Sequence, residues 1–255
     1  MKKTILLLAA ALILVSSVTR DGFVSAQAAE TTQSVVDKHL AAMGGREALA
    51  KLTSRKATGT IAISTPVGDI TGPVELYSKA PTKSRAVLAL DLTSLGGPGS
   101  VVIEQIFDGV AGWSIDPLQG DKEITGAQLD NMKHSQFPSF FLEKDNGGNK
   151  LELLPRETVA GKSWIVMKAT RPSGNFVTIY FDPATYLIAR VVSMIENPQT
   201  GAMIQQSGET QDYRTVDGVK VPFTIINSNE AQTITMKLTK VEHNVAIDDA
   251  MFKKK

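Results

Sequence analysis

The stretch "FDGVAGWSIDPLQG", Phe107 to Gly120, places a short apolar segment between two turn signals. Asp108-Gly109 is typical of a tight hairpin turn, and Asp116-Pro117 is typical of turn initiation. Between them, Trp113 and Ile115 are two residues apart, so their side chains share one face of an extended strand. We therefore interpret the stretch as a strand between turns, with both aspartates as turn residues and not as catalytic carboxylates.

The same pattern recurs along the chain. From Thr58 onward apolar residues alternate with polar ones, as in Thr233 to His243, and further turn signals stand at Ser173-Gly174, Asp182-Pro183 and Asp217-Gly218. The strands predicted in the second half are Trp164–Ala169, Val177–Phe181, Leu187–Ile195, Met203–Tyr213, Val221–Ser228 and Thr233–His243. Neighbouring strands joined by such turns are expected to be antiparallel. The stretch Leu95 to Ser100, "LGGPGS", is interpreted as a flexible connector.

Helical spacing occurs in two places. Ser34 to Leu52 has an apolar stripe interrupted by Gly44-Gly45, which predicts one helix and a second short one from Arg46 to Leu52. Gly126 to Lys144 interrupts the strands and predicts two short helices, the second starting at Pro138. Few helices and many hairpins predict a mainly β (α+β) fold, a strongly curved antiparallel sheet or barrel with helices on its concave side.

The first 28 residues have the features of an export signal. Lys2 and Lys3 precede an unbroken apolar run from Ile5 to Val15, and Ala26-Gln27-Ala28 is a small-residue cleavage site. We expect cleavage after Ala28 into the periplasm, which leaves 29–255 as a single domain. An uncleaved, membrane-tethered form is the alternative.

Composition excludes several classes of function. The chain has no cysteine, so it has no disulfide, thiolate metal site or thiol nucleophile. Its net charge is +1, and it becomes −1 after removal of residues 1–28, which gives no reason to expect nucleic-acid binding. His39, His134 and His243 lie far apart without metal-ligand spacing, so we expect neither a metal nor a cofactor.

No catalytic motif stands out. The chain lacks a Gly-x-Ser-x-Gly nucleophile elbow, and "GKS" at Gly161 to Ser163 lacks the upstream glycine of a phosphate-binding loop, so we interpret it as a hairpin turn. We therefore expect a protein that is not an enzyme, with a hydrolase that uses unmarked carboxylates as the least favoured alternative.

Flexible and aromatic apolar side chains are the remaining feature. They fit a sheet whose interior is covered by the helical insert and holds a ligand, although each could also fill a closed core. The candidate ligand-binding residues are Trp113, Met132, Phe137, Phe140, Phe141, Met167, Met194 and Met236.

Four stretches together resemble the outer-membrane lipoprotein-sorting, or LolA-like, proteins. They are "VVDKHLAAMGGREALAKLTSRKATGTI" (Val35 to Ile61), "FDGVAGWSIDPLQGDKEITGAQLDNM" (Phe107 to Met132), "VTIYFDPATYLIARV" (Val177 to Val191) and "DYRTVDGVKVPFTI" (Asp212 to Ile225). The resemblance implies an unclosed barrel, with a helical lid over a cavity that accepts acyl chains. It also implies that an arginine on an early strand helps to hold the lid, for which Arg55 and Arg85 are the nearby candidates.

These observations lead to three hypotheses for function. The first is a monomeric periplasmic protein that binds an acyl lipid or lipoprotein, with a role in lipoprotein sorting implied by the resemblance. The second is a non-catalytic envelope module that binds a protein partner, and the third is the hydrolase.

Overall fold

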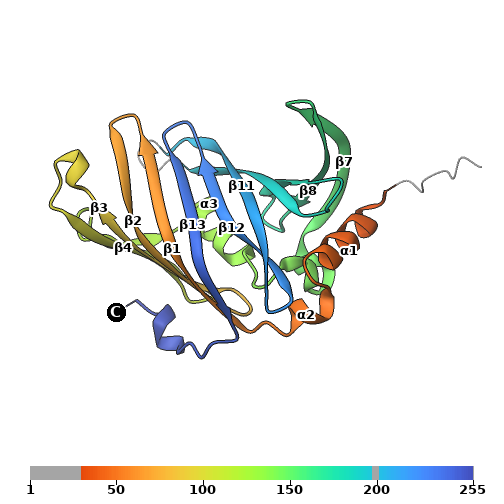
Figure 1. Cartoon of the computed structure of the whole chain (residues 1–255), viewed down its shortest axis with the longest axis horizontal. Coiled ribbons are helices and arrows are strands. Elements are labelled where there is room, and N and C mark those ends of the chain that lie inside the picture. The colour runs from red at the N-terminus through yellow and green to blue at the C-terminus, as the bar shows by residue number, and fades with distance from the viewer. Residues whose placement is uncertain (1–29, 197–200, 255) are drawn as a thin grey trace, which may run out of the picture.

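The computed structural model of the chain describes residues 30–196 and 201–254. Within them the chain forms one curved antiparallel sheet of 13 strands with a few short helices (Figure 1). The strands are β1 (Ser54–Thr65), β2 (Gly68–Lys79), β3 (Lys83–Asp91), β4 (Ser100–Phe107), β5 (Gly112–Ile115), β6 (Lys122–Ile124), β7 (Lys150–Val159), β8 (Lys162–Thr170), β9 (Phe176–Phe181), β10 (Ile188–Glu196), β11 (Met203–Val216), β12 (Val219–Ser228) and β13 (Thr233–His243). The helices are α1 (Thr32–Ala42), α2 (Arg46–Ala50), α3 (Gly126–His134) and the 3-10 turns η1 (Thr93–Leu95), η2 (Phe140–Leu142), η3 (Lys144–Gly148) and η4 (Asp249–Phe252).

The sheet is open, with β6 at one edge and β7 at the other. Its strand order is β6-β5-β4-β3-β2-β1-β13-β12-β11-β10-β9-β8-β7, so most neighbours in space are also neighbours in sequence. The pairing of β1 with β13 joins the two halves of the chain, with Arg55 opposite His243 and Ile63 opposite Ile234. The predicted fold class, a mainly β chain with a curved and unclosed antiparallel sheet, is confirmed.

The two faces of the sheet have different surroundings. Ala57 on β1 and Val241 on β13 are paired and belong to the buried core that α1, α2 and the segment around η2 form with the sheet. We call this the inner face. The opposite side is called the outer face. Because side chains alternate along a strand, Ile61 and Ile63 also lie on the inner face.

Strong curvature requires the strands to approach closely at particular residues. The β1–β13 register shifts between Thr58 and Gly59, which marks a bulge. A side chain at Gly72 would overlap the carbonyl oxygen of Ala89 on the neighbouring strand β3. Glycine is therefore needed at position 72, where the backbones of β2 and β3 approach each other closely.

The N-terminal helices form as the sequence predicts. Thr31 caps α1, because its side chain accepts a hydrogen bond from the Ser34 amide and Ser34 Oγ accepts one from the Thr31 amide. Gly44 and Gly45 then take φ values of 119° and 94°, which a residue with a side chain rarely adopts. The chain can therefore end α1 and begin α2 within four residues.

Three features differ from the sequence-based expectations or lie beyond them. β7 was not among the predicted strands, because its apolar residues do not alternate strictly and it contains Pro155. The stretch Leu95 to Ser100, expected to be a flexible connector, lies in a loop that contains the end of η1. A 3.0 Å hydrogen bond from the Leu92 amide to the Gly99 carbonyl closes this loop. The predicted signal peptide and its cleavage site lie outside the described residues. Among the described helices, none is both long and apolar enough to span a membrane.

Candidate functional site: an apolar strip and the insert that crosses the sheet

The insert, residues 125–149, connects the two edges of the sheet. It follows β6 at one edge and precedes β7 at the other, so it has to cross between them. Figure 1 shows α3 behind β12 and β13, and the insert continues towards α1. The predicted helical insert therefore exists, with α3 and two 3-10 turns in place of two short helices.

Asp130 fixes α3 to the β8–β9 turn. Its Oδ2 atom accepts hydrogen bonds from Arg171 Nη1 at 3.0 Å, Ser173 Oγ at 3.1 Å and Asn175 Nδ2 at 3.0 Å. Partial burial alone would raise the pKa of Asp130, but the hydrogen bonds from Asn175, Arg171 and Ser173 outweigh it and hold the pKa below its usual value. No residue of α3 is fully buried, so this polar cluster is a main attachment of the helix.

A second attachment lies near the end of α3. The Phe137 amide donates a 2.8 Å hydrogen bond to the Pro81 carbonyl in the β2–β3 turn. The Phe137 ring lies against Arg55 of β1, with 5.3 Å between Arg55 Cζ and the ring centroid. Burial lowers the pKa of Arg55 from its usual value. Of the two arginines named from the resemblance, Arg55 is the one that contacts the insert.

Arg85 has a different environment. Its guanidinium pairs with Glu104 at 2.7 Å and donates a hydrogen bond to the Met251 carbonyl in the C-terminal segment. It is paired across the sheet with Ile106, which is in turn paired with Trp113. Arg85 therefore holds the C-terminal segment against the sheet.

The second half of the insert closes a buried core with α1. Phe141 is 2% exposed, and its ring packs edge-on against His39 with 5.4 Å between centroids. His39 packs in the same way against Phe181 of β9. His39 Nδ1 lies 2.9 Å from the Tyr186 carbonyl, which can only accept, so Nδ1 carries the proton. Burial lowers the pKa of His39, although the hydrogen bond to Tyr186 partly opposes this effect.

Next to this core, the inner face continues as a strip of apolar side chains on β1–β4 and β13. Ile61, Val74 and Leu90 form its buried floor. The surrounding members are only partly buried although they are aliphatic or methionine. They are Ile63, Ile70, Leu76, Leu88, Leu92, Ile103, Ile234 and Met236, and we call the whole set the apolar strip. Leu76 also packs against the core under α1, so the strip and the core are continuous.

The structure divides the eight residues proposed from the sequence. Phe137, Phe141 and Met167 are buried in the core with α1, and Phe140 packs against it, so these four are close together. Met236 lies in the apolar strip. Met194 is 40% exposed and lines a small pocket with Asn131 and Arg171. The eight therefore do not form one cavity lining.

Trp113 lies on the opposite face of the sheet from Met132. A Cβ built on Gly112 would lie 3.2 Å from Met132 Sδ, so α3 covers the face to which Gly112 points. Trp113 is the next residue of β5 and its side chain must point the other way. The expectation that Trp113 faces the insert is therefore corrected. Alternation indicates which residues share a face, but it does not indicate which face is the inner one.

The sequence did not single out most members of the apolar strip. Aliphatic residues two apart on β1–β4 were recognised as strand positions, a pattern that any buried sheet face produces. Whether a helix covers a given position depends on the path of the insert, and the alternation of apolar residues in the strands does not predict that path. That Ile63 and Leu88 are only partly buried becomes visible only in the folded chain.

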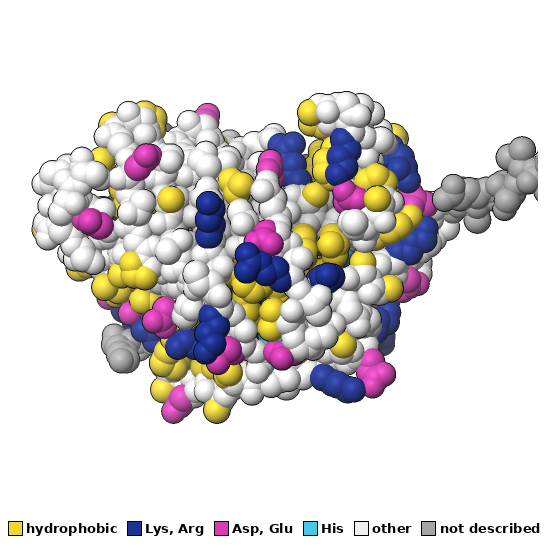
Figure 2. All heavy atoms as spheres, viewed as in Figure 1, with side chains coloured by type: hydrophobic (Ala, Val, Ile, Leu, Met, Phe, Trp, Pro, Cys, Tyr) yellow, Lys and Arg dark blue, Asp and Glu magenta, His cyan; other side chains and the backbone are white. Residues whose placement is uncertain are grey.

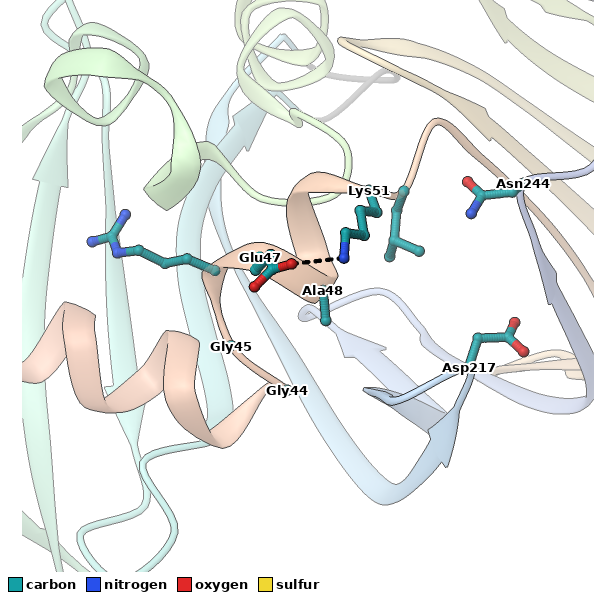
Figure 3. A pocket seen from close by; sticks show the side chains of 9 residues that line it. Gly44, Gly45, Glu47, Ala48, Lys51, Asp217 and Asn244 are labelled. Atoms are coloured by element: carbon teal, nitrogen blue, oxygen red, sulfur yellow. Dashed lines mark hydrogen bonds and ion pairs between the residues drawn. The ribbon is translucent and has the colours of Figure 1, made fainter.

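A wide cleft of about 690 Å³ lies elsewhere, at α2 (Figure 3). Glu47 of α2 and Lys51, which directly follows α2, form a 2.7 Å ion pair beside it. Asp217 lies in the β11–β12 turn and Asn244 directly follows β13. The cleft is open and lined by charged and small side chains. None of its lining residues belongs to the apolar strip.

The carboxylates of the opening stretch are turn residues, as predicted. Asp108 Oδ1 accepts hydrogen bonds from the Val110 and Ala111 amides, both at 2.8 Å. Asp116 Oδ1 accepts from the Leu118 amide at 2.8 Å. Among the described residues, no group of three or more His, Asp or Glu side chains is arranged to hold a metal ion.

The fold is similar to those of a LolA superfamily protein and of two further solved structures, all at 14% sequence identity or less. A LolA superfamily protein from Nitrosomonas europaea aligns with a TM-score of 0.57 and 14% identity over 89% of this chain and 99% of its own. A DUF1329 family protein from Desulfovibrio piger aligns with a TM-score of 0.57 and 12% identity over 88% and 98%. A putative outer membrane lipoprotein-sorting protein domain from Vibrio parahaemolyticus aligns with a TM-score of 0.53 and 12% identity over 87% and 97%. No family model and no curated protein matches the sequence.

Proposed function

We propose that this chain is a non-enzymatic binding protein of the periplasm that holds an acyl chain of a lipid or lipoprotein on its apolar strip. The observation that carries the proposal is the strip itself, a continuous inner face in which eight aliphatic or methionine side chains remain only partly buried. The fold supports it, because the chain shares its architecture with proteins named for lipoprotein sorting. Export through a cleaved signal peptide, with residues 29–255 as the working domain, is part of the same proposal.

An acyl chain fits this surface energetically. Each methylene removed from water contributes about 0.8 kcal/mol, so a chain of about 12 methylenes contributes roughly 10 kcal/mol before the costs of association and ordering. Leu88, Ile103 and Ile234 present only hydrocarbon, so the strip needs no polar partner from the ligand. Such a site selects for chain length and shape more than for a headgroup.

The insert governs access in this proposal. It is attached by polar contacts at Asp130 and by Arg55 and Pro81 at Phe137, while its second half is closed into the core by Phe141. The first half can therefore move without breaking the core. Met132, which lies over Gly112, is the residue of α3 placed to contact a bound chain.

Binding of a protein partner is the second candidate, and the cleft at α2 is the observation that favours it. Arg46, Lys51 and Asp217 there present both signs of charge to solvent around about 690 Å³ of open space. Such a surface matches the polar rim of a protein interface more closely than a lipid site.

Native mass spectrometry of the protein purified from a periplasmic extract tests the proposal. A bound acyl lipid that is displaced by a fatty-acid analogue supports acyl binding. A ligand-free protein that also fails to bind fatty-acid analogues of any chain length contradicts it, and a stoichiometric protein partner supports the second candidate.

A further inference from the structure

Arg55 differs from the other described arginines in the partners of its guanidinium. Arg190 donates a 2.7 Å hydrogen bond to Ser207 Oγ. The remaining described arginines each form an ion pair with a carboxylate, and they are Arg46, Arg85, Arg156, Arg171 and Arg214. Within residues 30–196 and 201–254, Arg55 forms neither an ion pair nor a hydrogen bond, and its guanidinium contacts the Phe137 ring.

The side chain of Arg55 points to the inner face. Arg55 precedes Ala57 by two residues on β1, so the two side chains lie on the same side of the sheet. Figure 2 shows the opposite side, away from α3, where several lysine and arginine side chains lie beside aspartate or glutamate. A guanidinium keeps its charge in proteins, so one that is enclosed by sheet and insert needs an acceptor or an anion.

The side chains around Arg55 supply no negative charge. Arg55 is paired with Ser78 of β2 and with His243 of β13. Asp217, in the β11–β12 turn, accepts a 3.2 Å hydrogen bond from His243 Nδ1 and forms no ion pair with Arg55. Burial lowers the pKa of His243, and the charge of Arg55 lowers it further. Among the described residues, no carboxylate therefore balances the charge of Arg55.

The guanidinium of Arg55 can still be reached. In the described part of the chain, the completely buried side-chain atoms that have no hydrogen-bond partner are Arg85 Nε and Gln136 Oε1. The nitrogens of Arg55 have no partner either, but they are not among these atoms. A group of the size of water can therefore contact them.

Arg55 also lies at the end of the apolar strip. Leu76, which belongs to the strip, is paired with Ala57. Ala57 and Arg55 are two residues apart, a distance of about 7 Å along β1. The small side chain of Ala57 adds no polar group between them. A ligand whose hydrocarbon lies on the strip can therefore have its polar end at Arg55.

We propose that Arg55 binds the anionic end, a carboxylate or a phosphate, of an acyl ligand whose hydrocarbon lies on the apolar strip. This inference rests on the proposed function and names its ligand class, an amphiphile with an oxyanion at one end. A planar guanidinium can donate two parallel hydrogen bonds to two oxygens of either group. The strip by itself does not distinguish headgroups, whereas an unpaired guanidinium favours an anion over a neutral group on a chain of the same length.

Three ligands of equal chain length test the inference, namely dodecanoate, dodecyl phosphate and 1-dodecanol. Their affinities are measured by displacement of a neutral fluorescent acyl probe from delipidated protein purified from a periplasmic extract. We expect wild type to bind at least one of the anions roughly tenfold or more tightly than dodecanol. Arg55→Met should lose this preference, and Arg55→Lys should keep part of it because it retains the charge but not the planar fork. Arg190→Met is the matched control and should keep the full preference.

The ratio of affinities separates anion binding from the attachment of the insert. A looser insert changes the affinity for all three ligands together, whereas loss of an anion contact changes only the two anions. Equal affinities of wild type for the three ligands overturn the inference and leave acyl binding intact. A preference that persists in Arg55→Met, or that is lost equally in Arg190→Met, overturns the assignment to Arg55. If wild type binds none of the three, the proposed function is contradicted and the inference falls with it.

Discussion

The guanidinium of Arg55 lies against the ring of Phe137, with 5.3 Å between Arg55 Cζ and the ring centroid. This contact joins a central strand of the sheet to the insert that crosses from one edge to the other. A cation over an aromatic ring contributes about 2 kcal/mol when water is excluded, and less when the pair is exposed. Because Phe137 is buried, the contact belongs to the stronger class.

Replacement of Arg55 by methionine tests this attachment. Arg55→Met keeps most of the apolar stem but removes the charge, so we expect the free energy of unfolding to fall by about 1–2 kcal/mol. Amide hydrogen exchange in residues 125–149 should become faster. Arg190→Met is the matched control, since Arg190 lies over Tyr180 at 5.6 Å on the outer face. Equal protection of the insert in both variants would show that Arg55 does not hold it.

Asp130→Asn should release the other end of α3. The amide oxygen can still accept from Arg171, Ser173 and Asn175, but the substitution removes the negative charge that strengthens these hydrogen bonds. We expect a loss of about 1–3 kcal/mol in stability and faster exchange in residues 126–134. Asp212→Asn, in an exposed pair with Arg214, should change stability by less than about 1 kcal/mol. A similar small effect at Asp130 would mean that apolar contacts alone hold α3.

Met236→Glu should weaken binding of an acyl ligand with little effect on the fold. A carboxylate in the apolar strip has to be desolvated or protonated when the chain binds, so we expect a loss of roughly tenfold or more in affinity. Thr235→Glu is the matched control, because the neighbouring residue on β13 points to the outer face. Titration with a fluorescent fatty-acid analogue measures the affinity, and the melting temperature reports on folding. Equal affinities for the two variants would place the ligand elsewhere.

Stability should decrease in mild acid because His39 is held neutral in the folded chain. Its pKa is lowered by burial, whereas in the unfolded chain it takes up a proton near pH 6.5. Below that pH the unfolded state binds more protons, so the free energy of unfolding falls as the pH falls and levels off below the folded-state pKa. The pKa of His243 is also lowered, chiefly by burial.

Thermal unfolding between pH 7.5 and pH 5 measures this effect. His39→Phe keeps an aromatic ring between Phe141 and Phe181 but loses the hydrogen bond to Tyr186. We expect it to be less stable at pH 7.5, with a smaller loss on acidification than wild type. An unchanged slope would show that His39 does not contribute to the pH dependence.

Local sequence signals were sufficient for most of the strands and for the C-terminal end of α1. Alternation from Thr233 to His243 predicted β13 with its observed bounds, and Gly44-Gly45 marked the change of direction between α1 and α2. These signals predict structure because the conformation of a turn and the alternation of side chains in a strand depend on residues that are close together in the sequence. β7 was missed because its register shifts around Pro155 and breaks the alternation.

The candidate site was much harder to predict. Phe137, Phe141 and Met167 were proposed as ligand contacts, and the structure places them in the buried core under α1. Trp113 was placed on the inner face, and it lies on the outer one. Both placements have one physical cause, since the path of the insert decides which face is covered and which part of it stays open. That path depends on long-range contacts such as Asp130 with Arg171, which are 41 residues apart.

Photo-crosslinking with a diazirine-bearing fatty acid, followed by peptide mapping, tests the central claim most directly. The account predicts labels on residues 61–76, 86–92, 101–103 and 234–238, which carry the apolar strip, and their loss when an unlabelled acyl chain competes. Labels on Met132 in α3 would agree with its position over Gly112. Competed labels confined to the cleft around Lys51 and Asp217, or to the outer face around Trp113, would contradict binding on the inner face.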